Sequence, residues 1–338
     1  MDNTIHLNFK AFDRSYLAIL KKDIHNLAVK AQFNETRLGE CDIIVSEMAG
    51  NLVKHADEGI ILAKIIDQNN LKGVEIISID KGPGINDLKR MMVDGMSTKN
   101  TLGHGLGAIR RLSHFFQVYS QKGWGTIMLV RIFGEEPPHF KKIPQVQVSS
   151  VIIPKPGEIE CGDSFFHKND ENFASFFLAD GLGHGHDAAE AVKTAGSAFA
   201  ICPDNDPPSI VRYISQSSRK TRGLVGTVVV FDKRDLKWRI CGVGNIMTKI
   251  TSSAISKTHV SYNGIIGLNL PNTLNSLEID YEKDQVLLMC SDGIRSRWDM
   301  IKYPGLFRND LSIIASTIFK DYSRNTDDMS VAACKINI

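Results

Sequence analysis

In the second half of the chain, aspartates stand beside glycines at the ends of several apolar, strand-like segments. Asp180 and Asp292 each follow such a segment and precede a glycine, and Asp327 stands just before another segment. An aspartate beside a glycine at a strand end is a turn by default. Several such carboxylates, with Asp163 after Gly162 as a fourth, are also what a site for a hard cation with oxygen ligands requires. The four turns together predict that strand ends distant in sequence converge in the fold.

The size and composition of the chain limit the remaining options. Its 338 residues are enough for about two domains, each with its own core. The formal net charge of +2 is close to balance, so composition gives no argument for a nucleic-acid or anionic-membrane partner. The six cysteines are scattered without a CxxC pair, which is typical of reduced thiols. No segment approaches the roughly 20 apolar residues that span a bilayer, so we expect a cytoplasmic protein.

The segment 134–150 interrupts the periodic patterns and divides the chain. Pro137, Pro138 and Pro144 lie in it among residues of mixed charge, which is typical of a linker. We therefore predict a first domain over residues 1–134, a linker over 135–145 and a second domain over 146–338.

The first domain mixes helix and strand signals. The apolar periodicity predicts a long helix over 37–55, with Asn34 or Thr36 as its N-cap, and a shorter helix over 106–116. Strands are predicted over 60–67, 74–80 and 126–133. This is the layout of an α+β domain, with helices on one face of a sheet.

The second domain is rich in strand signals. Helices are predicted over 187–200 and 209–219, and a hairpin over 228–243 turns at residues 232–235. The predicted strands cover 146–153, 173–179, 224–231, 238–243, 257–262, 285–290 and 330–336. Two stacked sheets flanked by helices fit this order, so the chain as a whole is expected to be α+β with two domains.

Three polar residues share one face of the predicted helix 37–55. Glu47, Asn51 and His55 are spaced four residues apart. By itself, such a stripe is equally consistent with the solvated side of an amphipathic helix. Two glycine-rich segments follow it: residues 80–84 close a strand, and residues 102–107 lead into a helix. Because glycines at a helix N-terminus let backbone N–H groups approach phosphate oxygens, this order predicts a nucleotide site.

The order Glu-x-x-x-Asn, Asp-x-Gly-x-Gly and Gly-x-Gly-x-Gly resembles the ATP-binding module of the GHKL superfamily, an α/β sandwich with the Bergerat fold. Over residues 1–134 it looks most like the serine kinases of bacterial partner switching, of the RsbT/RsbW type. The resemblance implies that Asn51 holds the Mg²⁺ of bound ATP and that Glu47 orients or deprotonates an attacking serine hydroxyl. It also implies a hydrogen bond from the adenine amino group to Asp80, an adenine pocket shaped by Gly82 and Gly84, and a phosphate lid formed by Gly103, Gly105 and Gly107.

Residues 146–338 resemble the metal-dependent (PPM) serine/threonine protein phosphatases, in the bacterial branch of the SpoIIE/RsbX type. The resemblance implies a β-sandwich flanked by α-helices, with two Mn²⁺ or Mg²⁺ ions that activate a water against a phosphoester. Asp180 would then bridge the ions, the carbonyl of Gly181 would bind one of them, and Asp292 and Asp327 would bind the other. Asp163 would act directly or through a bound water. Alignment of the motif favours Asp327 over Asp328.

The group that would bind the substrate phosphate is left open. In the better-known branch of the family an arginine just before the first metal aspartate has this role, whereas residues 158–162 contain no arginine and Lys155 is the nearest preceding cation. His184 and His186 flank the turn after Asp180, and their glycine-rich setting predicts solvent-facing turn residues. Asn245 is expected to be a turn residue behind the site.

These resemblances imply a phosphoserine/phosphothreonine protein phosphatase coupled to an ATP-binding, kinase-like domain. The expected substrate is a small phosphoprotein, a STAS-domain anti-sigma-factor antagonist. Two alternatives stay open: the ATP domain is only a sensor or docking module, or the chain is a non-catalytic protein that regulates a sigma factor by binding. No nucleic-acid or membrane partner is expected, and a homodimer is left open.

Overall fold

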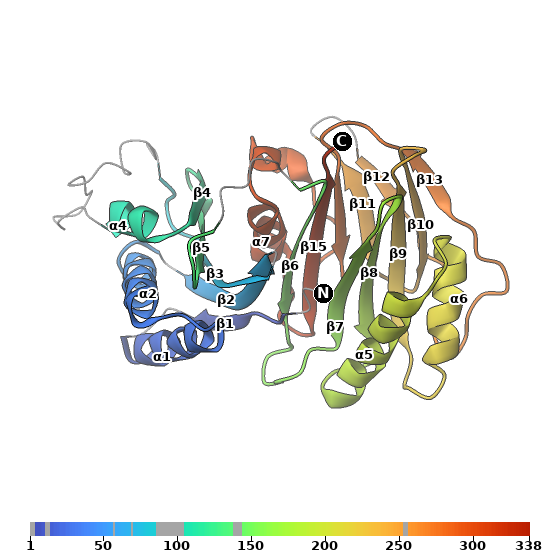
Figure 1. The fold of residues 1–338 in the computed structure, drawn as a ribbon, viewed down its shortest axis with the longest axis horizontal. Helices are drawn as coiled ribbons and strands as arrows, with labels where there is room; N and C mark the ends of the chain where they lie inside the picture. The colour runs from blue at the N-terminus through green and yellow to red at the C-terminus, as the bar shows by residue number, and fades with distance from the viewer. Residues whose placement is uncertain are drawn as a thin grey trace. The chain divides into compact units, whose positions relative to one another are not determined.

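The computed structural model describes residues 4–10, 14–56, 58–68, 70–85, 105–137, 144–252 and 256–338. They form two compact units, one comprising His6–Lys141 and the other Lys142–Ile338 together with Met1–Ile5. Figure 1 shows the helices and strands of both. Within the described ranges, every helix is too short or too polar to cross a lipid bilayer.

The first unit is built on one antiparallel sheet with helices packed on a single face (Figure 1). The helices are α1 (Arg14–Lys30), α2 (Glu35–His55) and α4 (Gly105–Leu112). In spatial order the strands are β1 (Leu7–Lys10), β2 (Gly59–Gln68), β3 (Leu71–Asp80), β5 (Gly125–Phe133) and β4 (Phe115–Gln121). Alternate strand residues such as Ile61 and Ile76 join Ile44 and Met48 of α2 in one hydrophobic core. The helix–sheet layer expected for an α+β domain is therefore present.

Helix α2 begins at Glu35, two residues before the predicted start at residue 37, and one of its two predicted N-caps is correct. Asn34 has an extended backbone and its side-chain oxygen accepts a hydrogen bond from the amide of Arg37 at 2.9 Å, so Asn34 rather than Thr36 is the N-cap. The buried side chains of the helix, among them Cys41, Ile44 and Met48, recur at helical spacing and face the sheet.

The predicted helix 106–116 is wrong in its last residues. Helix α4 ends at Leu112, and strand β4 begins at Phe115. The reason is the run of aromatic and β-branched residues from Phe115 onward, which pairs with β5 and places Val118 opposite Met128. Helix α1 and strand β1 were not predicted.

An ion pair crosses the first unit's sheet, and loss of one of its partners should destabilise that unit. Glu75 on β3 lies directly opposite Arg131 on β5, and the guanidinium donates to its carboxylate at 2.7 Å. Both Glu75 and the neighbouring Lys64 are buried. Burial alone would raise the pKa of Glu75, but the charges of Arg131 and Lys64 and the nearby His6, whose Nε2 lies 3.9 Å from the carboxylate, outweigh it and hold that pKa well below its usual range.

We expect Glu75→Gln to destabilise the first unit by about 3–5 kcal/mol, because it leaves buried cations without their counter-charge. Hydrogen exchange of the β3 and β5 amides measures this locally, without interference from unfolding of the second unit. The wild-type contribution should fade as pH falls, since the carboxylate must then be protonated. The matched control is Glu58→Gln, which removes an exposed carboxylate that pairs with Lys81 and should leave protection unchanged. Equal protection in both variants would contradict the expectation.

The second unit contains two five-stranded antiparallel sheets (Figure 1). The first sheet has the order β13 (Leu277–Asp280), β10 (Lys237–Val243), β9 (Leu224–Asp232), β8 (Phe173–Gly181) and β7 (Asp163–Asn169). The second has the order β12 (Ser256–His259), β11 (Met247–Thr251), β14 (Val286–Cys290), β15 (Met329–Ile336) and β6 (Val146–Ile153). The structure thus confirms a mixed α and β fold with several antiparallel sheets.

The two sheets enclose a core and carry helices on their outer faces. Phe176 and Trp238 from the first sheet pack with Met289 and Ala332 from the second. Helices α5 (His186–Ile201) and α6 (Pro207–Ser217) cover the outside of the first sheet, where Phe199 joins a separate core. Helix α7 (Leu311–Tyr322) packs on β6 and β15, and two short 3₁₀ helices, η1 (Met300–Lys302) and η2 (Leu306–Arg308), precede it.

Several predicted boundaries in the second unit need correction. The predicted strand 257–262 ends at His259, because Tyr262 turns away to bridge Val243. The predicted helix 209–219 spans Pro207–Ser217, because Asp206 caps it and a proline is tolerated in the first helical turn. Strands β7, β11 and β13 and helix α7 were not predicted. The hairpin of β9 and β10 turns at residues 232–235 as predicted.

A buried histidine on the edge strand β12 should make the second unit sensitive to acid. His259 is 7% exposed, and its Nε2 has no hydrogen-bond partner among the residues that the structure describes. Burial lowers the pKa of His259 to about 4, against about 6.5 in an unfolded chain. Its contribution to stability is therefore complete above pH 6.5 and is lost as pH falls towards 4, because only the unfolded state gains the proton.

We expect His259→Gln to flatten the pH dependence of unfolding between pH 6.5 and 4, by at most about 1.4 kcal/mol per pH unit. Thermal midpoints of both proteins, measured from pH 8 down to pH 4, test this. The comparison at pH 8 corrects for any change in packing, because His259 is neutral there in both states. Parallel pH profiles would contradict the expectation.

Candidate functional sites

Strands β7 and β8 bring two of the predicted aspartates side by side. Their antiparallel register places Asp163 directly opposite Asp180. Residues directly opposite each other in such a pair point to the same face of the sheet. This face is the one turned towards the second sheet, because Phe165 and Leu178 are the next pair along it and both lie in the core between the sheets. Asp163 and Asp180 therefore stand at one end of the space between the sheets.

The second sheet supplies the other two aspartates at the same end. Asp292 comes two residues after β14, and Asp327 two residues before β15. These strand ends are adjacent, since the amide of Ser291 donates to the carbonyl of Ser330 at 3.1 Å. The charges of Asp163, Asp292 and Asp327 all act on Asp180. The four predicted carboxylates are thus brought into one acidic cluster.

The acidic cluster is electrostatically crowded. Burial raises the pKa of Asp163 to about 7, with further increases from the charges of Asp328 and Asp292. Burial, followed by the charge of Asp163, raises the pKa of Asp180 well above its usual range. The hydroxyls of Ser291 and Ser330 lie close enough to Asp163 to offset part of its shift, yet neither of its carboxylate oxygens has a partner with hydrogen-bond geometry.

Such a cluster fits divalent cations. Asp163 is 1% exposed and both of its oxygens lack partners, an arrangement that costs free energy unless a positive charge compensates it. The donor set is made only of oxygen, which favours Mg²⁺ or Mn²⁺ over zinc. In the part of the chain that the structure describes, no three His, Cys, Asp or Glu side chains are already arranged to hold a metal ion. The aspartates therefore lie in one site, but their side chains are not arranged as a complete set of metal ligands.

Asp328 has a structural role beside the cluster. It is buried, and its two carboxylate oxygens accept hydrogen bonds from the amides of Lys155 at 2.8 Å and Gly162 at 3.0 Å. These bonds tie the start of β15 to the loop that leads into β7. Asp327 is more exposed and accepts only from the amide of Asp328 at 3.0 Å among the hydrogen bonds of the described residues. The assignment of Asp327 as the ligand stays a prediction, and this difference favours it.

Two glycines allow the backbone at the cluster to pack closely. A Cβ on Gly181 would lie 2.4 Å from the carbonyl oxygen of Ala188 at the start of α5. A Cβ on Gly293 would lie 1.9 Å from the carbonyl oxygen of Asp328. Neither position has room for a side chain, which explains why glycine follows each of the two aspartates.

The histidines after Asp180 pair with glutamates rather than with the acidic cluster. His184 Nδ1 is 2.7 Å from Glu158, and His186 Nδ1 is 3.1 Å from Glu160. Both histidine side chains are well exposed, at 46% and 71%. The prediction of a solvent-facing turn residue is confirmed for His184, whereas His186 faces solvent as the first residue of α5 rather than from a turn.

Asn245 was predicted only as a turn residue behind the site, and the structure gives it a direct contact with the acidic cluster. Its side-chain amide donates to Asp292 at 2.9 Å, from the turn between β10 and β11. Because Gly244 before it has φ +102°, the turn directs the chain back towards the cluster. Asn245 therefore positions the Asp292 carboxylate. In the sequence, only its place in a turn after Gly244 pointed towards this role.

In the first unit, the polar face of α2 meets the start of α4. A Cβ on Gly105, the first residue of α4, would lie 2.8 Å from Glu47 Oε2 and 3.8 Å from Asn51 Oδ1. The structure therefore brings together Glu47, Asn51 and Gly105, which belongs to the described end of the second glycine-rich segment. Gly107 lies buried in the first turn of α4, whereas Gly103 is outside the described residues.

Asp80 organises the end of β3 next to this site. Its Oδ1 accepts from the amides of Gly82 at 2.7 Å and Thr126 at 3.1 Å. Gly84 has φ +76° and approaches the carbonyl of Gln121 so closely that a Cβ would clash with it. The sequence did not single out Thr126; its only signal was its place at the start of the predicted strand 126–133.

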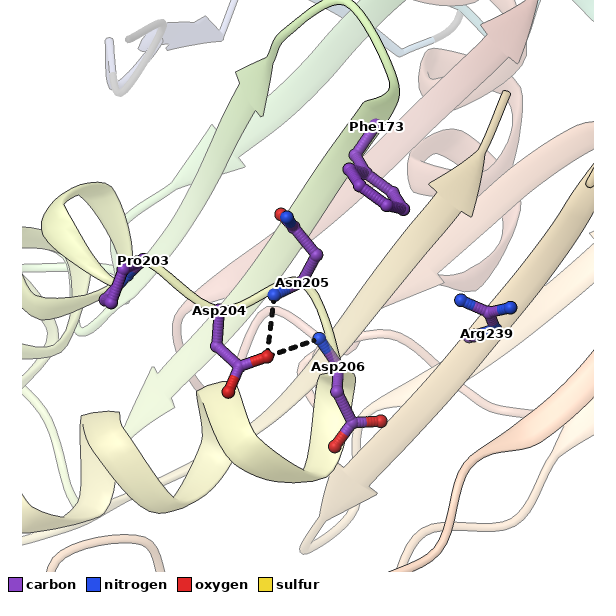
Figure 2. A pocket seen from close by; sticks show the side chains of 6 residues that line it. All are labelled: Phe173, Pro203, Asp204, Asn205, Asp206 and Arg239. Carbon is purple, nitrogen blue, oxygen red and sulfur yellow. Dashed lines mark hydrogen bonds between the residues drawn. The ribbon is translucent and has the colours of Figure 1, made fainter. Parts of the chain in front are cut away.

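A further pocket, of about 430 Å³, lies at the opposite end of the first sheet from the acidic cluster (Figure 2). Its polar groups already have partners. Asp204 accepts from the amides of Asn205 and Asp206, Asp206 caps α6, and Arg239 pairs with Glu278 at 3.2 Å. The remaining lining residues are Phe173 and Pro203. It offers no unpaired charge for catalysis.

Comparison with known proteins relates the chain to both kinds of domain. No protein-family model matches it. It is 36% identical over 101 residues to the serine/threonine-protein kinase RsbT of Bacillus subtilis (strain 168), which covers 30% of this chain and 76% of RsbT. It is 27% identical over 141 residues to the phosphoserine phosphatase RsbX of the same organism, and the match covers 41% of this chain and 70% of RsbX. The crystal structure of RsbX in complex with magnesium has a TM-score of 0.51 to it, with 22% identity, over 58% of this chain and 98% of RsbX.

Proposed function

Because the chain belongs to the family of the serine/threonine-protein kinase RsbT over the matched residues, and also resembles RsbX, we propose that it adds and removes phosphate on serine or threonine of a partner protein. The second unit is the phosphatase, and the first unit is an ATP-binding, kinase-like domain. The observation that carries the phosphatase assignment is the meeting of Asp163 and Asp180 with Asp292 and Asp327 from the opposite sheet.

In this proposal the acidic cluster binds two Mn²⁺ or Mg²⁺ ions. Asp180, Asp292, Asp327 and the carbonyl of Gly181 would hold the ions, with Asp180 serving both, and Asp163 would act directly or through water. When bound, the ions supply a water of lowered pKa and neutralise charge on the transferring phosphoryl group. The protein's own contribution is to hold mutually repelling carboxylates in place, by the β7–β8 register and the bond from Asn245 to Asp292.

In the first unit, Glu47 is proposed to orient or deprotonate the attacking hydroxyl and Asn51 to hold the Mg²⁺ of ATP. Asp80, Gly82 and Gly84 are proposed to hold the adenine, and Gly103, Gly105 and Gly107 to cover the phosphates. The proximity of Gly105 to Glu47 and Asn51 supports this, since it places a helix N-terminus over both side chains.

The proposed partner is a small STAS-domain phosphoprotein that antagonises an anti-sigma factor, acted on in the cytoplasm. The names of the two Bacillus relatives, a serine/threonine kinase and a phosphoserine phosphatase, support a substrate phosphorylated on serine or threonine. Opposed activities on one chain would make the phosphorylation state of that partner depend on which unit it meets.

The full chain, incubated with Mn²⁺ and a serine-phosphorylated STAS protein, should release phosphate, and chelation of the metal should stop the release. Phosphate is measured in solution, and the partner's modification is followed by mass spectrometry. The same incubation with ATP and the unphosphorylated partner tests the first unit. If neither phosphoserine substrates nor aryl phosphates release phosphate in a metal-dependent way, the phosphatase assignment is refuted.

A further inference from the structure

The cluster of carboxylates explains how metal ions would be held, but it cannot bind the phosphate dianion of the substrate by itself. The proposed metal ions offset part of this repulsion, and a cation of the protein beside the turn that follows Asp180, here called the metal turn, would bind the remaining phosphate oxygens. The segment before Asp163, residues 158–162, supplies no arginine. A cation with this role would therefore come from another part of the fold.

Arg222 reaches this turn from the neighbouring strand. It precedes β9, and the amide of Leu182 donates to the carbonyl of Gly223 at 3.1 Å, so the segments after β8 and before β9 run together. A Cβ built on Gly183 would lie 3.0 Å from an Nη atom of Arg222 and 3.4 Å from its Cζ. The guanidinium thus rests on the backbone of Gly183, three residues after Asp180.

The guanidinium of Arg222 is exposed and carries no ion pair among the described residues. Glu158 is an acid of the same neighbourhood, with its carboxylate 3.1 Å from the position of a Cβ on Gly185. It pairs with His184 at 2.7 Å instead. The charge of Arg222 is therefore available to a ligand that approaches the metal turn.

Gly183 is what makes this placement feasible. With φ +84° it adopts a backbone conformation that side chains disfavour, and any side chain there would displace the guanidinium. A planar guanidinium presents two parallel N–H donors that match two phosphate oxygens, which a lysine ammonium cannot do. Lys155, the nearest cation that precedes Asp163 in the sequence, has its backbone amide bound to Asp328.

On the basis of the proposed function, we infer that Arg222 binds the phosphate group of the substrate phosphoserine or phosphothreonine. It donates in a bidentate manner to two oxygens that are not bound by metal. It is a substrate-binding residue and takes no part in proton transfer. The hydrolytic step, attack of water on phosphorus with departure of the serine oxygen, is unchanged by it.

The test uses the full chain with Mn²⁺ and an aryl phosphate, which removes any influence of protein docking. Arg222→Ala should raise KM about 10- to 100-fold and weaken inhibition by inorganic phosphate by a similar factor, because a charge-assisted bond to the phosphate is lost. Arg222→Lys should recover part of both. The Mn²⁺ concentration for half-maximal activity and the thermal midpoint should stay unchanged, whereas a merely structural role would shift them.

The matched control is Arg219→Ala, which removes an exposed cation three residues earlier that has no such contact with Gly183. Its KM and phosphate inhibition should equal those of the wild type. Unchanged KM in Arg222→Ala, or an equal increase in Arg219→Ala, overturns the inference while the phosphatase assignment stands. A large increase in Lys155→Ala but not in Arg222→Ala would also overturn it. A wild-type protein without metal-dependent activity refutes the proposed function instead.

Discussion

Asp180→Asn should abolish metal-dependent hydrolysis of phosphoserine, with a loss of at least about 10³-fold in kcat/KM. Metal activation of water and neutralisation of phosphoryl charge are each worth several kcal/mol, and both depend on the bridging carboxylate. Phosphate release from a phosphorylated partner, measured over a range of Mn²⁺ concentrations, gives the result. ATP binding by the first unit should be unaffected.

The same variant should not unfold the protein. Asp180 is partly buried and lies near Asp163, Asp292 and Asp327, and removal of its charge relieves repulsion in the metal-free state. The thermal midpoint without metal should therefore equal or exceed that of the wild type. This combination, lost activity with retained or increased stability, distinguishes a metal ligand from a residue that only supports the fold.

Asp232→Asn is a suitable control for Asp180→Asn. Asp232 is also a buried aspartate of the same sheet, but it lies at the opposite end of β9 and caps the turn by accepting from the amides of Arg234 and Asp235. An asparagine oxygen can still accept these bonds, so hydrolysis should persist. Hydrolysis by Asp180→Asn at the rate of the control would remove the metal assignment.

Glu47→Ala should abolish phosphorylation of the partner, with an expected loss of about 10²- to 10⁴-fold, the range typical of a general base. ATP should still bind, because Asp80 and its glycine turn do not depend on Glu47. The measurement is transfer of phosphate from ATP to the partner, made in the Asp180→Asn background so that the product is not hydrolysed again. Binding of ATP is followed separately by calorimetry.

Glu40→Ala, on the same helix, serves as the control for Glu47→Ala. Glu40 pairs with Arg37 near the start of α2 and has no contact with Gly105. Phosphorylation should be retained in this variant. If Glu47→Ala transfers phosphate as fast as Glu40→Ala, the first unit is a sensor or docking module rather than a kinase.

Local sequence patterns determined many of the elements. The long helix α2 and its cap at Asn34, strands β2, β3 and β5, and the β9–β10 hairpin follow from apolar periodicity, capping chemistry and turn residues, which act within a few positions of the chain. The same locality explains the errors. Whether residues 113–116 continue α4 or enter β4 depends on pairing with β5, which no local pattern contains.

The candidate site residues were visible in the sequence because their neighbours were unusual: aspartates at strand ends and glycines where backbones approach closely. Their arrangement was not visible. The β7–β8 register places Asp163 against Asp180, and the packing of two sheets adds Asp292 and Asp327. Strand β7 itself was not predicted, so the sequence alone could not have paired the first two aspartates.

By itself, the sequence determined which residue types are present, where turns form and which segments are helical or extended, since these depend on steric and hydrogen-bonding preferences of adjacent residues. Only the tertiary structure decided that Asp328 anchors a loop, that Asn245 holds Asp292, and that Arg222 rests on Gly183. Each of these contacts joins segments tens of residues apart or more, and the chain meets there only because burial of two apolar sheet faces outweighs the entropy of closing the intervening loops.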